Sequence, residues 1–137
     1  MSSLLRCMML DLYQCDRERL VNEDFIKEHL IKAARIGGAE VVGYNFHTFK
    51  PWGVSGVVTI AESHLAVHTW PEYDFAAVSI ETCGQRVDPK KMADYLIKVF
   101  RSEHQEISEF GRGYTTFAPD LKNHESKERG ESCASPT

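Results

Sequence analysis

The 137-residue chain has the length of a single domain, and its 42% of hydrophobic residues can build a core. A net charge of -4 and scattered Lys and Arg residues argue against nucleic-acid binding, and no apolar run reaches the about 20 residues that span a membrane. The four cysteines form no CxxC pair and no zinc-like spacing, and no signal peptide is visible, so we expect reduced thiols in a cytoplasmic protein without a metal.

The first half of the chain predicts two strands with a helix between them. Residues 6–12 form a short apolar run that is typical of a buried strand. Asn22 can cap a helix, apolar residues follow at helical spacing, and Gly37 and Gly38 end the pattern. Residues 41–47 predict the second strand, which ends at a turn-rich stretch containing Pro51 and Gly53.

The middle of the chain predicts three successive strands, at residues 54–61, 64–70 and 75–82. The first two would be joined across a turn at Glu62 and Ser63. In the third, strand alternation puts every second side chain on one face. The side chains expected on that face are Phe75, Ala77, Ser79, Glu81 and Cys83.

The last elements complete an α+β pattern. Asp88 followed by Pro89 is a strong helix start, and residues 105–110 can form a final strand. We therefore expect a two-layer α/β sandwich over residues 1–118, a mainly antiparallel sheet with two helices on one face. The polar segment 119–137 predicts a disordered tail, in which Cys133 would be an exposed thiol without a function.

Glu62, Ser63 and His64 form a polar triplet between two strand patterns, where a hairpin turns or a reactive group is exposed. In a strained turn, Ser63 could attack the carbonyl of Glu62 to give an ester. β-Elimination and hydrolysis would then cut the chain and leave a pyruvoyl group at residue 63. His68 is a candidate base for this chemistry and Ser55 a candidate donor to the oxyanion.

A pyruvoyl group would take the place of pyridoxal phosphate. It forms a Schiff base with an amino-acid substrate and accepts electrons when carbon dioxide leaves. The thiol of Cys83 is a candidate proton donor to the resulting carbanion.

Simpler interpretations of the same residues stay open. Ser63 and Ser55 could be ordinary turn residues, and Cys83 a small buried hydrophobe. His64 and His68 could be a metal pair, although no third ligand has matching spacing. The aromatic side chains near them could belong to the core; these are Phe49, Trp52 and Trp70.

The run SGVVTIAESHLAVHTWPEY, followed by AAV and TCG, resembles the prokaryotic S-adenosylmethionine decarboxylase family of pyruvoyl-dependent enzymes. MLDLYQCD and FHTFKPWGVSG extend the likeness, which covers residues 6–113. The resemblance implies a proenzyme that cleaves between Glu62 and Ser63 and supplies aminopropyl groups for spermidine synthesis. It also implies a homodimer of cleaved protomers in which each active site uses residues of both.

The resemblance assigns roles to further residues. Ser55 and His68 match the family's processing residues, and Cys83 matches its proton donor. Phe49 and Glu72 match positions that hold the adenosyl group by stacking on adenine and binding the ribose hydroxyls. Trp70 is a further expected contributor to substrate binding.

The chain also departs from the family's familiar pattern near these positions. The departures are Gln14, Trp52, Asp74, Phe75, Ser79, Ile80 and Glu81. Glu81 is expected to line the pocket, and added carboxylates there or at Asp74 would fit a basic substrate such as arginine or ornithine. Phe49 and Glu72 favour S-adenosylmethionine. An unprocessed, non-catalytic binding module is a third possibility.

Overall fold

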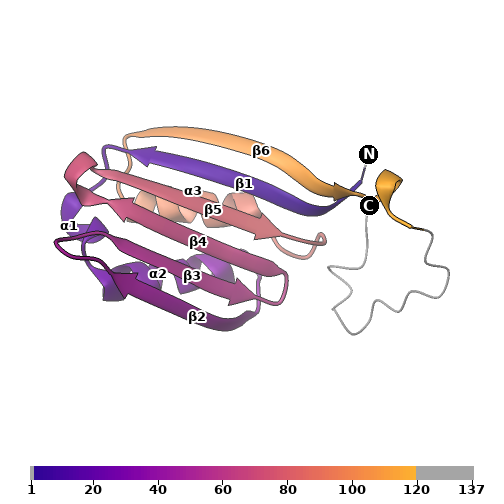
Figure 1. Ribbon diagram of the computed structural model, residues 1–137, viewed down its shortest axis with the longest axis horizontal. Coiled ribbons are helices and arrows are strands. Elements are labelled where there is room, and N and C mark those ends of the chain that lie inside the picture. Colours follow the sequence, from indigo (N-terminus) through magenta and orange to yellow (C-terminus); the bar gives the residue numbers. More distant parts are fainter. Residues whose placement is uncertain (1, 120–137) are drawn as a thin grey trace.

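The computed structural model describes residues 2–119 and contains one six-stranded antiparallel sheet (Figure 1). The strand order across the sheet is β2-β3-β4-β5-β1-β6. The strands are β1 (Ser3–Tyr13), β2 (Val41–Thr48), β3 (Val54–Ile60), β4 (Ser63–Trp70), β5 (Phe75–Thr82) and β6 (His104–Tyr114). The helices are α1 (Arg17–Leu20), α2 (Glu23–Ile36) and α3 (Pro89–Val99), with 3-10 turns η1 (Pro71–Tyr73) and η2 (Thr115–Phe117).

Local capping chemistry fixes where the two long helices begin. The side chain of Asn22 accepts a hydrogen bond from the backbone N–H of Phe25 at 3.0 Å, and Gly37 caps the other end of α2. Asp88 accepts from the N–H of Lys91 at 3.2 Å, with Pro89 in the first turn of α3. Both predicted helices are therefore confirmed.

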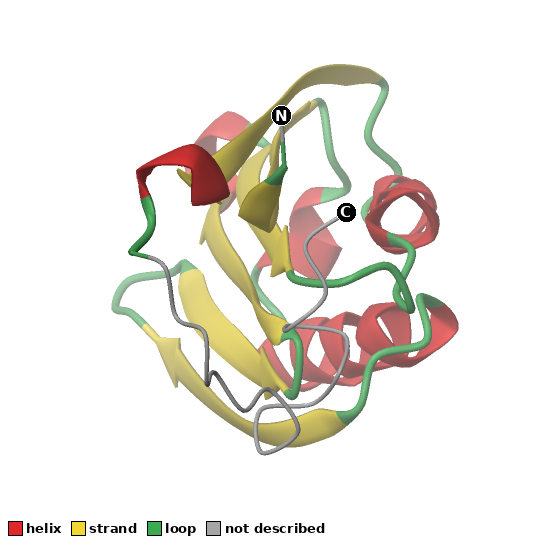
Figure 2. Ribbon diagram, turned by 90° about the vertical axis from the view of Figure 1, so that its right-hand side faces the viewer, coloured by secondary structure: helices red, strands yellow, loops and turns green. Residues whose placement is uncertain are grey.

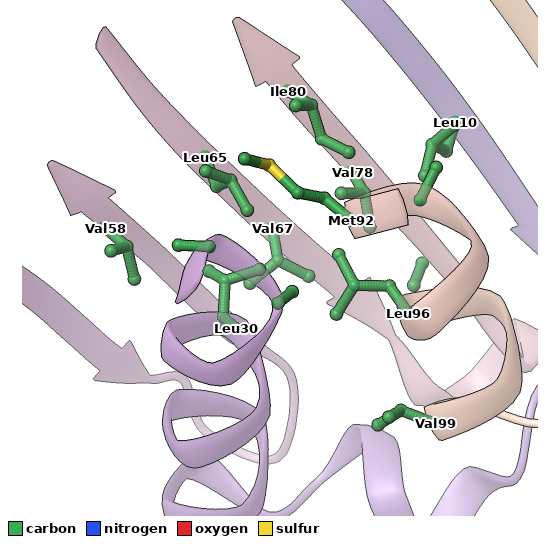
Figure 3. Packing of buried hydrophobic residues seen from close by; sticks show 14 of the residues in the cluster. Leu10, Leu30, Val58, Leu65, Val67, Val78, Ile80, Met92, Leu96 and Val99 are labelled. Atoms are coloured by element: carbon green, nitrogen blue, oxygen red, sulfur yellow. The ribbon is translucent and has the colours of Figure 1, made fainter. Parts of the chain in front are cut away.

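Helices α2 and α3 cover the same face of the sheet (Figure 2), and within residues 2–119 no α-helix covers the other face. Figure 3 shows Leu30 from α2 and Leu96 from α3 packed over apolar side chains of the central strands. On β5 the alternation is as predicted, since Ala76, Val78 and Ile80 are at most 1% exposed. The predicted two-layer α/β sandwich is confirmed, and its uncovered face carries the alternate side chains of every strand.

Several boundaries differ from the prediction. Strands β1 and β6 are longer than expected, and the turn between β3 and β4 consists of Ala61 and Glu62, so that Ser63 already belongs to β4. Helix α1 was not predicted, because four residues are too few to show a helical period. Within residues 2–119 no helix is long and apolar enough to cross a membrane. The predicted disordered tail and Cys133 fall in residues 120–137, outside the described part of the chain.

Candidate active site

Ser63 has a backbone conformation that L-amino acids rarely adopt. Its φ angle is 136°, and the residue is held there by pairing with Ile60 of β3 on one side and Thr82 of β5 on the other. Such conformations cost free energy and persist only where the surrounding structure imposes them. The sheet therefore imposes strain on the residue next to the predicted cleavage point.

The carbonyl of Glu62 is the group that Ser63 would attack, and it faces β5. Its oxygen accepts a hydrogen bond from the backbone N–H of Cys83 at 2.9 Å, and Cys83 Sγ lies 3.1 Å from it. Glu62 is 5% exposed and Cys83 6% exposed. A fixed donor in a site that excludes water stabilises negative charge on an attacked carbonyl oxygen. The structure thus places Cys83 beside the carbonyl that Ser63 would attack, whereas the sequence predicted Cys83 only as the proton donor in decarboxylation.

The cysteines do not all have the expected redox state. Among the residues that the structure describes, Cys7 and Cys15 are free thiols, and burial raises the pKa of Cys15 to about 11. Cys83 is disulfide-bonded, so the prediction of a reduced thiol is wrong at this position. Cysteine spacing alone does not determine which thiols pair, and for that reason the sequence could not show it.

A second set of polar side chains reaches Ser63 from the same end of the sheet. Ser63 Oγ and His64 Nδ1 are hydrogen-bonded at 3.1 Å, and His64 Nε2 lies 3.4 Å from Glu81 Oε2. Arg112 of β6 donates to the other Glu81 oxygen at 3.1 Å. We call Glu62, Ser63, His64, Glu81 and Cys83 the cleavage cluster.

Glu81 does not lie open in a pocket, although the sequence predicts it as a pocket-lining residue. Its side chain is 10% exposed, and it is paired with Arg112 and flanked by Cys7 Sγ at 3.6 Å. Burial, together with the neighbouring Glu81 charge, raises the pKa of Cys7. The roles of His64 and Arg112 were missed because they depend on which strands are neighbours, and β6 pairs with β1 rather than with the preceding strand.

Ser55 and His68 form a second group, at the other end of the β3–β4 hairpin. They are opposite each other in the strand register, and Ser55 Oγ is hydrogen-bonded to His68 Nδ1. The His68 ring lies 4.1 Å from the Trp70 ring and 5.9 Å from the Phe49 ring, and Phe75 is 5.5 Å from Trp70. We call Phe49, Ser55, His68, Trp70 and Phe75 the aromatic cluster.

The aromatic cluster is an open surface. Phe49 is 42% exposed and Trp70 36%, and Trp52 nearby is 50% exposed, so none of the three is a core residue. Glu72, which follows Trp70 in η1, is exposed as well. A hollow of about 440 Å³ beside the cluster is lined by ten residues, among them Ser55, His68, Ala77 and Ser79. These features suit a ligand with a flat ring.

The two clusters are far apart within one protomer. His68 lies five positions after Ser63 along β4, which corresponds to about 16 Å at the rise of a β-strand. In Figure 1 the β3–β4 turn lies at the right end of the sheet and η1 at the left. The structure therefore brings Ser55 to His68, and Cys83 to the Glu62 carbonyl that precedes Ser63, but it does not bring the two pairs together.

The same spacing bears on the possible metal pair. His64 and His68 share a face but are about 13 Å apart along the strand, too far to bind one ion. Among residues 2–119 no group of three or more His, Cys, Asp or Glu side chains could hold a metal.

Comparison with known proteins supplies the family. Residues 6–113 match the family model described as S-adenosylmethionine decarboxylase. Two relatives are named "S-adenosylmethionine decarboxylase proenzyme". The protein from Fervidobacterium nodosum is 50% identical over 113 residues, which cover 82% of this chain and 82% of that protein. The protein from Thermotoga maritima is 46% identical over 113 residues, which cover 82% of this chain and 87% of that protein. The crystal structure of the adenosylmethionine decarboxylase from Aquifex aeolicus superposes with a TM-score of 0.80 at 27% identity, covering 88% of this chain and 100% of that one. The chain belongs to the S-adenosylmethionine decarboxylase family.

Proposed function

We propose that this chain is a pyruvoyl-dependent decarboxylase of S-adenosylmethionine that makes its own cofactor by cleaving between Glu62 and Ser63. The observation that carries the proposal is the strained Ser63, whose preceding carbonyl already accepts the Cys83 N–H at 2.9 Å. The product would supply aminopropyl groups for spermidine synthesis. Family membership supports the substrate as well as the chemistry.

Self-cleavage uses only groups of this chain and one water molecule. Ser63 Oγ attacks the Glu62 carbonyl carbon, and the charge that develops on the oxygen is met by the Cys83 N–H. Opening of the C–N bond gives an ester, and removal of the Ser63 α-proton expels the Glu62 carboxylate. Hydrolysis then releases ammonia and leaves chains of residues 1–62 and 63–137.

The pyruvoyl group supplies an electron sink for decarboxylation. Around it, Cys83 as a thiol would protonate the product carbon, which requires that its disulfide be reduced. A cytoplasmic location would keep this thiol reduced. Self-cleavage relies on the backbone N–H of the same residue and is independent of the thiol.

We propose a homodimer in which the uncovered faces of two sheets pack together. His64 and Glu81 lie on the uncovered face at the opposite end from Ser55 and His68. A two-fold axis between the two ends therefore puts each cleavage cluster against the partner's aromatic cluster. Small side chains between the clusters, Ala66, Ala77 and Ser79, allow two sheets to approach closely. This arrangement joins the two pairs that a single protomer keeps about 16 Å apart.

In such a composite site each group has a defined task. The rings of Phe49 and Trp70 stack on adenine, and Glu72 accepts hydrogen bonds from the ribose hydroxyls. His68, held by Ser55, removes the Ser63 α-proton of the facing protomer during maturation. The amino-acid end of the substrate then reaches the cleavage cluster.

The alternative of a basic substrate loses its main support in the structure. Asp74 is paired with Arg17 at 2.8 and 3.3 Å, and Glu81 with Arg112 at 3.1 Å. Both added carboxylates are thus neutralised by arginines of the same chain and are not free to bind a substrate cation. Arginine and ornithine remain as control substrates.

The experiment combines intact-mass measurement with a substrate assay, both under reducing conditions. The wild-type chain should separate into two chains with a pyruvoyl group at residue 63, whereas Ser63→Ala should stay intact. Carboxyl-labelled S-adenosylmethionine, arginine and ornithine are then tested in parallel, and only the first should release substantial carbon dioxide. A folded chain that stays uncleaved and traps no amine with borohydride would indicate a binding module.

A further inference from the structure

We propose that His64 is a catalytic residue of the first step of self-cleavage, in which it takes the hydroxyl proton of Ser63, and that Glu81 positions it. The inference deepens the proposed function and rests on it. It assigns the two proton transfers of maturation to two different histidines, His64 for the hydroxyl proton and His68 for the later α-proton.

The attack of Ser63 needs a base within hydrogen-bonding reach of its hydroxyl group. His64 Nδ1 lies 3.1 Å from Ser63 Oγ in the same chain. His68 is about 16 Å away along β4 and, in the proposed dimer, belongs to the facing protomer's site. His64 is therefore in place before any partner or substrate arrives.

His64 can accept a proton at Nδ1 only if its other ring nitrogen carries the hydrogen. The carboxylate of Glu81 lies 3.4 Å from Nε2 and favours a proton there, which leaves Nδ1 as an acceptor. The same carboxylate stabilises the imidazolium that forms during the attack. Serine, histidine and carboxylate are thus arranged in the order that activates a serine nucleophile.

Glu81 is fixed well enough for this task. Its side chain is 10% exposed, and its second oxygen is held by Arg112 at 3.1 Å, with Cys7 Sγ at 3.6 Å. On the other side of His64 the register partner in β3 is Thr59, which does not titrate. Glu81 contacts His64 but no reacting atom, and so it is a positioning residue.

The step balances without an external reactant. The Oγ–H proton moves to Nδ1 while the Oγ–C bond forms, and the carbonyl electron pair moves to the Glu62 oxygen beside the Cys83 N–H. When the carbonyl re-forms, the C–N bond breaks and the imidazolium returns the proton to the Ser63 nitrogen. The products are an ester and a free amine, and His64 is neutral again.

The test follows maturation of freshly synthesised full-length chain in a cell-free reaction, with and without hydroxylamine, which cuts esters but not amides. His64→Ala should slow cleavage by about 10²–10⁴-fold and accumulate a precursor that hydroxylamine does not cut, because the ester does not form. Added imidazole should speed this variant. His68→Ala should instead accumulate an ester that hydroxylamine cuts.

Glu81→Gln keeps the shape of the side chain and should slow ester formation by about 10- to 100-fold in the wild-type background. In the His64→Ala background it should have no further effect, whereas a merely structural role would add to the loss. The matched control is His104→Ala, which removes another His–Glu pair, at 3.3 Å from Glu106, and should cleave at the wild-type rate. Thermal melting shows whether each variant is folded. If His64→Ala does not fold, His64→Gln is tested in its place.

Three outcomes would overturn the inference while the wild-type chain still matures. They are cleavage of the His64 variants at the wild-type rate, accumulation of the ester in them, and a Glu81→Gln defect that persists in full without His64. A wild-type chain that never cleaves would contradict the proposed function itself.

Discussion

The cleavage cluster and the aromatic cluster lie at opposite ends of the β3–β4 hairpin, yet they differ in burial and chemistry. As whole residues, Glu62, Glu81 and Cys83 are at most 8% exposed and are fixed by neighbouring strands, whereas Phe49 and Trp70 are 42% and 36% exposed. The carbonyl that Ser63 attacks needs a fixed donor that is shielded from water before any ligand is bound. A surface that binds a ligand keeps its ring faces open until the ligand and the partner cover them.

The largest effect is expected for a substitution in the cleavage cluster that separates self-cleavage from decarboxylation. Cys83→Ala keeps the backbone N–H that faces the Glu62 carbonyl, so the chain should still cleave. It lacks the thiol, and decarboxylation should therefore fall by about 10²–10⁴-fold. Intact mass and carbon dioxide release measure the two tasks, and equal loss of both would show that they are not separable.

A smaller effect is expected at the aromatic cluster, and on substrate binding only. Phe49→Ala should raise KM for S-adenosylmethionine by roughly 5- to 150-fold, since stacking on a nucleobase contributes about 1–3 kcal/mol. Its self-cleavage should be unchanged. Trp52→Ala is a control, because this ring is 50% exposed and lies outside the cluster. Equal KM values for the two variants would argue against adenine stacking at Phe49.

A residue of the helix layer should affect stability and leave both clusters intact. Burial lowers the pKa of His29, whose Nδ1 lies 2.6 Å from the hydroxyl group of Tyr95. The folded state therefore disfavours protonation of His29. The contribution that neutral His29 makes to the free energy of unfolding is fully present above about pH 6.5 and is lost as the pH falls through the lowered pKa. Between pH 8 and pH 5 the melting temperature of His29→Gln should fall less steeply than that of the wild-type chain. An equal slope for the two proteins would contradict this prediction.

The smallest effect is expected at Asp74, beside the aromatic cluster. Its carboxylate is paired with Arg17, whose side chain is 63% exposed, and such surface pairs contribute little. Asp74→Asn should leave the ratio of activities on S-adenosylmethionine and arginine unchanged. A shift of that ratio in parallel assays would instead place Asp74 in substrate selection.

Local signals in the sequence were sufficient for the elements and for part of the site. Asn22 and Gly37 predicted the ends of α2, and the alternation along β5 predicted the face that carries Glu81 and Cys83. These features depend on neighbours within a few residues, where capping and strand periodicity act. The resemblance of one continuous run then predicted the family.

The remaining features depend on contacts between distant segments. Arg112 meets Glu81 only because β6 pairs with β1, and the pairing partner of an edge strand has no local signature. The φ angle of Ser63 is imposed by two neighbouring strands, and the separation of Ser63 from His68 follows from the hairpin register. Residue spacing suggested that these groups are close, whereas strand geometry separates them.

The most direct test of the composite site is a mixed dimer of two inactive variants. Protomers with Ser63→Ala and protomers with His68→Ala are co-expressed with different tags and purified as the heterodimer. One intact site then combines Ser63 of the His68→Ala protomer with His68 of the Ser63→Ala protomer. The His68→Ala chain should therefore cleave, and activity per dimer should reach about half of the wild-type value. A heterodimer in which both chains stay intact and no carbon dioxide is released would contradict the shared site.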